Sequence, residues 1–181
     1  MLFARAIRLS TEMFNGEPPD SGTMLTVGDD APDFAAPRVN AKTEPFRLST
    51  RGDTGPVVLA FFPAAFSTTC TEELCTVRDE LGTFEELNAR VFGISTDLPY
   101  ALSRFRAEHD LGFALISDND GSIIDAYDVV DEWEDINLSG VAQRAAFVID
   151  ADGVIRYVWR AENPGKEPDY DAVVDAVESL S

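Results

Sequence analysis

Apolar residues occur along the chain in two kinds of pattern, continuous runs and helical spacing, and the order of these patterns predicts an α/β protein. Continuous apolar runs, which are typical of buried strands, occur at 57–62, 91–95 and 113–116. Apolar residues at three- and four-residue steps, which mark one face of a helix, predict helices over about 71–88, 99–108 and 168–180. Short strands and turns are expected over 28–56, where proline, glycine and aspartate are frequent.

The last third of the chain predicts a hairpin followed by the final helix. Apolar runs at 145–149 and 154–159 are joined by a short turn containing an Asp-Gly pair, which is typical of a β-hairpin. Residues 122–127 predict one helical turn, and 128–140 an acidic loop. Strands joined by helices pair in parallel and a hairpin pairs antiparallel, so we expect a mixed sheet in an α/β sandwich.

Length and composition fit a single globular domain of 181 residues, 45% of them hydrophobic. We expect this domain to occupy 24–181, after a flexible N-terminal extension at 1–23 whose second half has a loop-forming composition. No apolar run is long enough to span a membrane, and the N-terminus lacks the apolar core of a signal peptide.

The charge is strongly negative, with 33 acidic residues against 14 basic ones and a formal net charge of −19. This balance disfavours nucleic-acid binding through phosphates. The acids are dispersed, and Lys42 and Lys166 are the only lysines. That pattern favours adaptation to a salty cytoplasm over an ordinary acidic protein, because salt screens the self-repulsion. We therefore expect a cytoplasmic, halophilic protein that loses stability when salt is removed.

The chain has two cysteines, Cys70 and Cys75, which follow the strand at 57–62 as a helix begins. Most free cysteines are small buried hydrophobes, but a thiol in the first turn of a helix lies at the positive end of the helix dipole. That position favours the thiolate, which is the reactive form. Hydroxyls at 67–69 can donate hydrogen bonds to a thiolate or to a bound oxygen ligand. Glu72 and Glu73 place negative charge near this thiol and so disfavour a thiolate, so a nearby cation is needed.

Cys75 cannot reach Cys70 on an intact helix. Residues five apart have Cα atoms roughly 8–9 Å apart, beyond the limit of about 7 Å for a disulfide. A disulfide therefore requires the first helical turn to unwind, which happens readily at a helix end. If Cys70 is unreactive, Cys75 is an ordinary helix residue. We expect Thr69 to cap this helix, with Glu72 completing a capping box.

Other chemistries find less support in the sequence. Two thiols and one histidine do not match the ligand spacings of a zinc site. We expect His109 at the surface, at a helix end, although spacing alone leaves a Cys–His pair of the thiol-protease type open. Pro63 ends its strand because it has no N–H to donate, and it can shield a thiolate with apolar surface.

The arrangement Pro63-x-x-x-Ser67-x-x-Cys70 resembles the signature of the peroxiredoxins. The flanking residues at 58–63 and 75–79 are also similar to that family, as is the family-type opening at 27–34. Residues 144–153, Arg-Ala-Ala-Phe-Val-Ile-Asp-Ala-Asp-Gly, resemble the strand that carries the family's active-site arginine. The resemblance covers Val27 to about Trp159.

This resemblance implies a thioredoxin-like α/β fold, a central mixed β-sheet flanked by helices, and an enzyme with no metal or organic cofactor. Cys70 would be the peroxidatic nucleophile that attacks a hydroperoxide and becomes a sulfenic acid. Arg144 would be the missing cation. Ser67 and the backbone N–H groups at the helix start would stabilise charge on the peroxide oxygens. Glu73 matches the position that helps to hold the arginine.

The position of Cys75 resembles the bacterioferritin comigratory protein/PrxQ group, in which a resolving cysteine lies five residues along the same helix. This implies an intramolecular disulfide that thioredoxin or a similar thiol donor reduces. The Ala64–Ser67 loop is instead similar to AhpE-type peroxiredoxins, and a monomer and a homodimer both stay open. The rival functions are a thiol–disulfide oxidoreductase, which the absence of a Cys-x-x-Cys pair disfavours, and a redox sensor or scaffold on the same fold.

Overall fold

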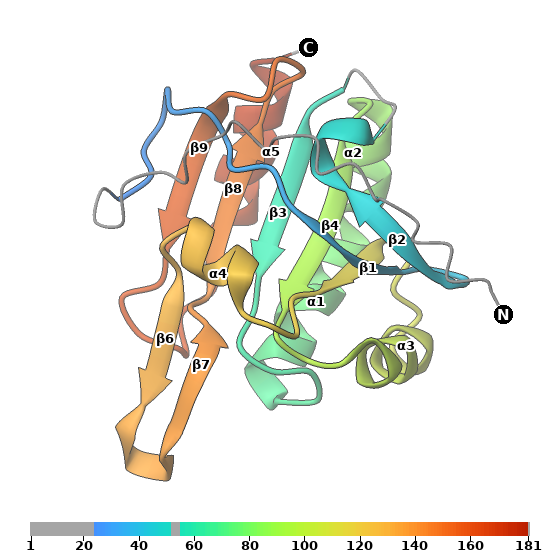
Figure 1. The fold of residues 1–181 in the computed structure, drawn as a ribbon. Coiled ribbons are helices and arrows are strands. Elements are labelled where there is room, and N and C mark those ends of the chain that lie inside the picture. The colour runs from blue at the N-terminus through green and yellow to red at the C-terminus, as the bar shows by residue number, and fades with distance from the viewer. Residues whose placement is uncertain (1–23, 52–54, 181) are drawn as a thin grey trace, which may run out of the picture.

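The computed structural model describes residues 24–51 and 55–180, so the extension predicted at 1–23 lies outside the described residues. Figure 1 shows a central sheet with the order β2-β1-β5-β4-β3-β8-β9 and a separate ribbon, β6-β7. The strands are β1 (Ala35–Val39), β2 (Thr43–Arg47), β3 (Val57–Phe61), β4 (Arg90–Ser95), β5 (Ala114–Ser117), β6 (Val130–Trp133), β7 (Leu138–Ala142), β8 (Ala145–Ile149) and β9 (Ile155–Arg160). The helices are α1 (Thr68–Asp79), α2 (Leu81–Glu86), α3 (Pro99–Glu108), α4 (Ser122–Ala126) and α5 (Tyr170–Glu178), with 3-10 turns η1 (Leu48–Thr50) and η2 (Glu134–Ile136).

The sheet is mixed, as the sequence predicts. Strand β3 runs parallel to β4 and antiparallel to β8, while β8 and β9 form the expected antiparallel hairpin. All five residues of β3 are buried because both faces of the sheet are covered. Val57, Leu59 and Phe61 pack into the cluster on the α4 side, and Val58 packs into the cluster built with α1, α2, α3 and α5.

The helix expected over 71–88 is divided into α1 and α2. The backbone turns at Glu80 (φ −88°, ψ −2°), which ends one helix and precedes the next. Apolar spacing continues across the break from Val77 to Leu81 and Phe84, so the pattern could not show it. The predicted Thr69 cap is wrong: α1 begins at Thr68 after Ser67, and no side chain caps it.

The predicted acidic loop at 128–140 is also wrong, because most of it forms the β6–β7 ribbon. The ribbon turns through η2 and through Asn137, which has a left-handed backbone (φ 52°). Within it the Trp133 indole N–H donates to Asp131 over 3.0 Å. Asp131 and Glu132 interrupt the apolar pattern of the short strand β6, and Ser139 and Gly140 interrupt that of β7, so neither strand has a clear signal in the sequence.

The remaining elements agree with the sequence to within a few residues. Helix α3 spans the predicted residues, with Pro99 in its first turn. Helix α5 is shorter than predicted, because Asp169 caps it by accepting a hydrogen bond from the Ala172 N–H. Among the described residues, no helix is both long enough and apolar enough to cross a bilayer.

Candidate active site

The site forms where β3 and β8 lie side by side at the centre of the sheet. Their antiparallel register pairs Phe61 with Ala145, so the residue before β8, Arg144, lies beside the chain leaving β3. That chain passes through the buried Pro63 into α1, whose third residue is Cys70. Two residues 74 positions apart in sequence therefore meet because of strand register.

Arg144 and Cys70 are in direct contact. The Arg144 Nη2 donates to the Cys70 Sγ over 3.5 Å, and the two residues are only 2% and 0% exposed. A guanidinium beside sulfur favours the thiolate. The sequence required a cation near the thiol, and the structure brings Arg144 to that position.

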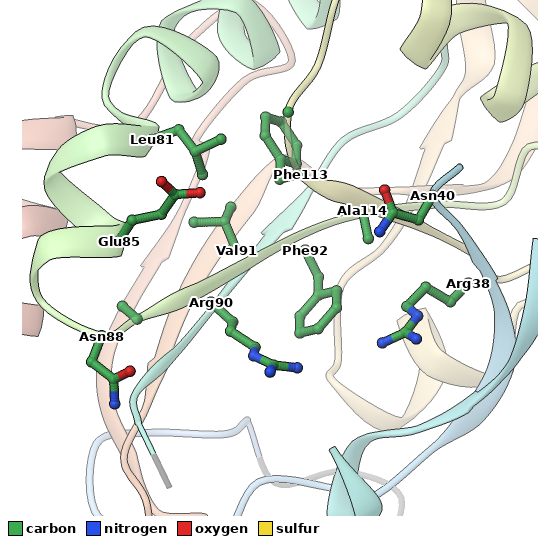
Figure 2. A pocket seen from close by; sticks show the side chains of 12 residues that line it. Arg38, Asn40, Leu81, Glu85, Asn88, Arg90, Val91, Phe92, Phe113 and Ala114 are labelled. Carbon is green, nitrogen blue, oxygen red and sulfur yellow. The ribbon is translucent and has the colours of Figure 1, made fainter. Parts of the chain in front are cut away.

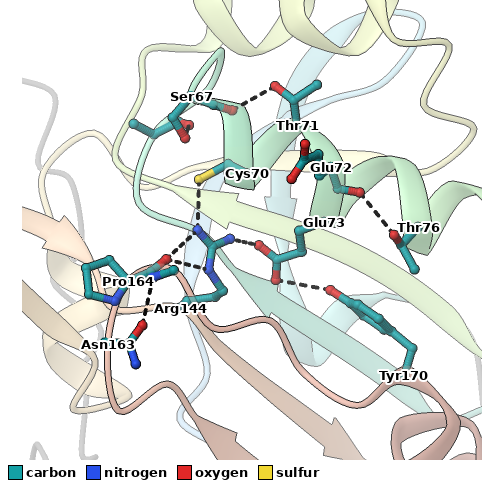
Figure 3. A network of polar contacts seen from close by, with 12 residues as sticks. Ser67, Cys70, Thr71, Glu72, Glu73, Thr76, Arg144, Asn163, Pro164 and Tyr170 are labelled. Atoms are coloured by element: carbon teal, nitrogen blue, oxygen red, sulfur yellow. Dashed lines mark hydrogen bonds and ion pairs between the residues drawn. The ribbon is translucent and has the colours of Figure 1, made fainter.

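Glu73 holds Arg144 from the adjacent turn of α1, with both of its carboxylate oxygens engaged (Figure 3). Its Oε2 forms an ion pair with Arg144 Nη1, and its Oε1 accepts a hydrogen bond from the Tyr170 hydroxyl over 3.1 Å. Burial raises the pKa of Glu73 to about 7 against the opposing effect of Arg144. Burial lowers the pKa of Arg144, but the charges of Glu73 and Cys70 outweigh it and leave that pKa raised.

The connection between β9 and α5 completes the arginine's surroundings. The carbonyl of Pro164 accepts hydrogen bonds from Arg144 Nε, over 3.2 Å, and from Nη2, over 3.0 Å. The guanidinium plane is thus fixed by Glu73, Cys70 and Pro164 together (Figure 3). The sequence predicts only an amphipathic helix over 168–180, so the contact of Tyr170 with Glu73 was missed. The available signal was its polar tip, since a buried tyrosine hydroxyl usually finds a partner.

The loop before α1 is held in an unusual conformation. Phe66 has a left-handed backbone (φ 66°) and is 49% exposed, although a bulky residue rarely adopts that conformation. The Ser67 hydroxyl donates to the Ala64 carbonyl over 3.1 Å, and the Ala65 N–H donates to Asp97 Oδ2 over 2.8 Å. Sequence reasoning missed Asp97, although its place just after β4 put it at the edge where the neighbouring strand β3 also ends.

Cys75 lies apart from this network. Both cysteines are free, and α1 is helical through both of them. Cys75 is half-buried, and on a helix it points about 140° away from Cys70 around the axis. The structure therefore joins Cys70, Glu73 and Arg144, places Pro63 and Ser67 in the adjoining loop, and leaves Cys75 on another face of α1.

Two other places for chemistry are less suitable. His109 follows α3 and stacks edge-on against Phe105, with ring centroids 4.8 Å apart. A cavity of about 310 Å³ opens near the start of β4, where Phe92 lies between Arg38 and Arg90 (Figure 2). None of the predicted site residues lines it. Within 24–51 and 55–180, no group of three His, Cys, Asp or Glu side chains could hold a metal.

Comparison with known proteins gives matches over most of the chain. The sequence model of the AhpC/TSA family matches residues 27–158. Peroxiredoxin Bcp of Escherichia coli is 34% identical over 140 residues, which cover 75% of this chain and 85% of that protein. Alkyl hydroperoxide reductase E of Mycobacterium bovis is 33% identical over 162 residues, covering 87% and 99%. The crystal structure of peroxidoxin BcpB from Mycobacterium tuberculosis superposes with a TM-score of 0.77 at 30% identity, covering 88% and 99%.

Proposed function

The chain belongs to the AhpC/TSA family and is a peroxiredoxin, a thiol peroxidase with a hydroperoxide substrate and a thiol reductant, and from that membership we propose that Cys70 is its peroxidatic cysteine. The observation that carries this proposal is the hydrogen bond from Arg144 Nη2 to Cys70 Sγ at the buried start of α1. Within residues 24–51 and 55–180, no cation donates a hydrogen bond to the Cys75 sulfur, although the charge of Arg78 interacts with this thiol.

In the first step the Cys70 thiolate attacks the terminal oxygen of hydrogen peroxide or of a small organic hydroperoxide. The O–O bond breaks as the S–O bond forms, so sulfur is oxidised by two electrons to a sulfenic acid. The leaving oxygen departs with the bonding pair and takes up a proton, giving water or an alcohol. No metal or organic cofactor takes part in this step.

Four neighbouring residues have supporting roles in the proposal. Arg144 favours the thiolate and orients the peroxide, and Glu73 holds Arg144 in place through their ion pair. The Ser67 hydroxyl, once it turns from the Ala64 carbonyl toward the peroxide, and the free N–H groups at the start of α1 stabilise the charge that develops as the O–O bond breaks. The buried ring of Pro63 keeps water away from the sulfur.

In the second step we assign Cys75 as the resolving residue. Its thiol attacks the sulfenic sulfur of Cys70, water leaves, and an intramolecular disulfide forms. Because α1 is intact across both cysteines, this step requires the start of the helix to unwind. A thioredoxin-like dithiol protein then restores both thiols by disulfide exchange.

The test is stopped-flow fluorescence of reduced protein mixed with hydrogen peroxide, followed by mass spectrometry of the product. Cys70→Ser should abolish the fast reaction. Cys75→Ser should keep the first reduction, stop at the Cys70 sulfenic acid and lose turnover with thioredoxin. Full thioredoxin-dependent turnover by Cys75→Ser would remove the resolving role, and a wild-type rate no faster than that of a free thiol would favour the redox-sensor alternative.

A further inference from the structure

Glu73, which lies between the two cysteines on α1, is held by a residue near the C-terminal end of the sequence. Glu73 lies three residues after Cys70 and two before Cys75, and it is fully buried. Arg144 engages one carboxylate oxygen, and the hydroxyl of Tyr170, the first residue of α5, engages the other. Figure 3 shows Tyr170 reaching this carboxylate from the side opposite the arginine.

Disulfide formation must disturb this anchor. On the helix, Cys75 points about 160° away from Glu73, so the Cys70 sulfur has to leave the Arg144 side and pass around the axis. The backbone hydrogen bonds of 71–74 break as it does so, and Glu73 lies within that segment. Glu73 can move with the unwinding backbone only if its ion pair with Arg144 and its hydrogen bond from Tyr170 are both broken.

We propose that Tyr170 is a positioning residue that, through Glu73, holds α1 in its helical form and sets how long the Cys70 sulfenic acid persists before Cys75 reaches it. This inference rests on the proposed resolving role of Cys75. Tyr170 acts on the opening of the helix and touches neither sulfur in the network of contacts described above. Its loss therefore favours the unwound form of α1.

The persistence of the sulfenic acid decides between two products. In the helical form a second hydroperoxide molecule can oxidise the Cys70 sulfenic acid to a sulfinic acid, with release of water or alcohol. In the unwound form the Cys75 thiol attacks the same sulfur and water leaves. The ratio of sulfinic acid to disulfide at a fixed peroxide concentration therefore measures the opening of α1 under the influence of Tyr170.

The experiment compares the wild-type full chain with Tyr170→Phe, which removes only the hydroxyl. Reduced protein is mixed with hydrogen peroxide at increasing concentrations and quenched. Mass spectrometry then distinguishes the disulfide from the sulfinic acid. A hydrogen bond to a charged group contributes enough that we expect disulfide formation to be about tenfold faster in Tyr170→Phe. The peroxide concentration that gives half sulfinic acid should rise by about the same factor.

Tyr127→Phe is the matched control. Tyr127 is fully buried and donates its hydroxyl to the Pro32 carbonyl over 2.8 Å, in the core cluster on the α4 side of the sheet. This variant also loses a buried tyrosine hydrogen bond, so it destabilises the fold without touching Glu73. We expect its product ratio to equal that of the wild type, and a shift equal to that of Tyr170→Phe would overturn the inference.

Amide hydrogen exchange tests the same idea without oxidation. In reduced Tyr170→Phe the amides of residues 71–75 should exchange about tenfold faster than in the wild type, while Tyr127→Phe leaves their relative protection unchanged. Equal exchange and equal product ratios in wild type and Tyr170→Phe would overturn the role of Tyr170 alone. A wild type that forms no Cys70–Cys75 disulfide would instead overturn the resolving role of Cys75, and with it this inference.

Discussion

Two arginine–glutamate pairs in this molecule have the same chemistry and very different surroundings. Arg104 and Glu108 lie one turn apart on the exposed face of α3, 2.9 Å from each other, with side chains 76% and 48% exposed. Arg144 immediately precedes β8 and Glu73 lies on α1, and their side chains are 1% and 0% exposed. Water and salt screen the first pair, whereas the second is surrounded by protein.

The comparison shows that the contribution of an ion pair to stability depends on how far water reaches it. An exposed pair on a helix stabilises a fold by about 0.3–0.5 kcal/mol. A buried pair gains little net stability, since desolvation offsets its attraction, but breaking it leaves a buried charge alone. In this protein the buried pair keeps a cation against Cys70, and a surface pair could not do so through water.

The largest expected effect is from Glu73→Ala, which leaves Arg144 as an uncompensated buried charge. We expect the free energy of unfolding to fall by about 3–5 kcal/mol and the peroxide reaction of Cys70 to slow. Urea unfolding and stopped-flow fluorescence measure the two effects, with Glu108→Ala as the matched control in the surface pair. A loss below about 1 kcal/mol would mean that the buried pair behaves like an exposed one.

The next effect is the pH dependence that belongs to Glu73. Its pKa is raised in the folded state, from an ordinary value of 4.5 to about 7, so the folded protein holds this proton more tightly than the unfolded chain. The corresponding stability is complete below pH 4.5 and is lost as pH rises toward 7. The stability of the wild type minus that of Glu73→Gln should therefore decrease over this interval.

Other carboxylates work in the opposite direction, so the difference between variants is the quantity to measure. Hydrogen bonds hold the pKa of Asp120 below its ordinary value, and stability from that group is lost as pH falls. Urea unfolding of both proteins across the interval cancels such shared contributions. A constant difference from pH 4.5 to 7 would contradict the raised pKa of Glu73.

The smallest expected effect is from Arg104→Ala in the surface pair. The free energy of unfolding should fall by about 0.3–0.5 kcal/mol at low salt and by less at high salt, and the peroxide rate should stay the same. Thermal and urea unfolding at two salt concentrations check this. A loss as large as that of Glu73→Ala would remove the distinction between the pairs.

Local sequence patterns predicted the helices and strands whose own residues show a clear apolar spacing, apolar run or terminal proline. Pro99 and the helical spacing after it defined α3, and the apolar run ending at Phe62 defined β3. The β6–β7 ribbon was missed because both strands are short, two of the four residues of β6 are acidic and β7 contains a glycine. Thr69 was wrong as a cap because the helix already begins at Thr68, after Ser67. Adaptation to a salty cytoplasm stays a prediction, and measuring whether the free energy of unfolding falls when salt is removed tests it.

The residues of the site likewise divide into those that local sequence features could identify and those that they could not. Cys70 could be chosen from local features, and the need for a cation followed from Glu72 and Glu73, but Arg144 itself came from family resemblance. Tyr170 was missed because its contact with Glu73 spans 97 residues. Strand register and loop path decide such contacts, and neither has a local signature.

The register that pairs Phe61 with Ala145 also has a consequence for the newly made chain. As it leaves the ribosome, the protein presents Cys70 long before Arg144 exists, and Pro164 and Tyr170 follow later still. Until β8 is laid beside β3, this thiol has the reactivity of any cysteine on an unfolded peptide. On the proposed roles of Cys70 and Arg144, a chain interrupted before Arg144 would react with peroxide no faster than an ordinary thiol, and the fast reaction would arrive only with the completed sheet.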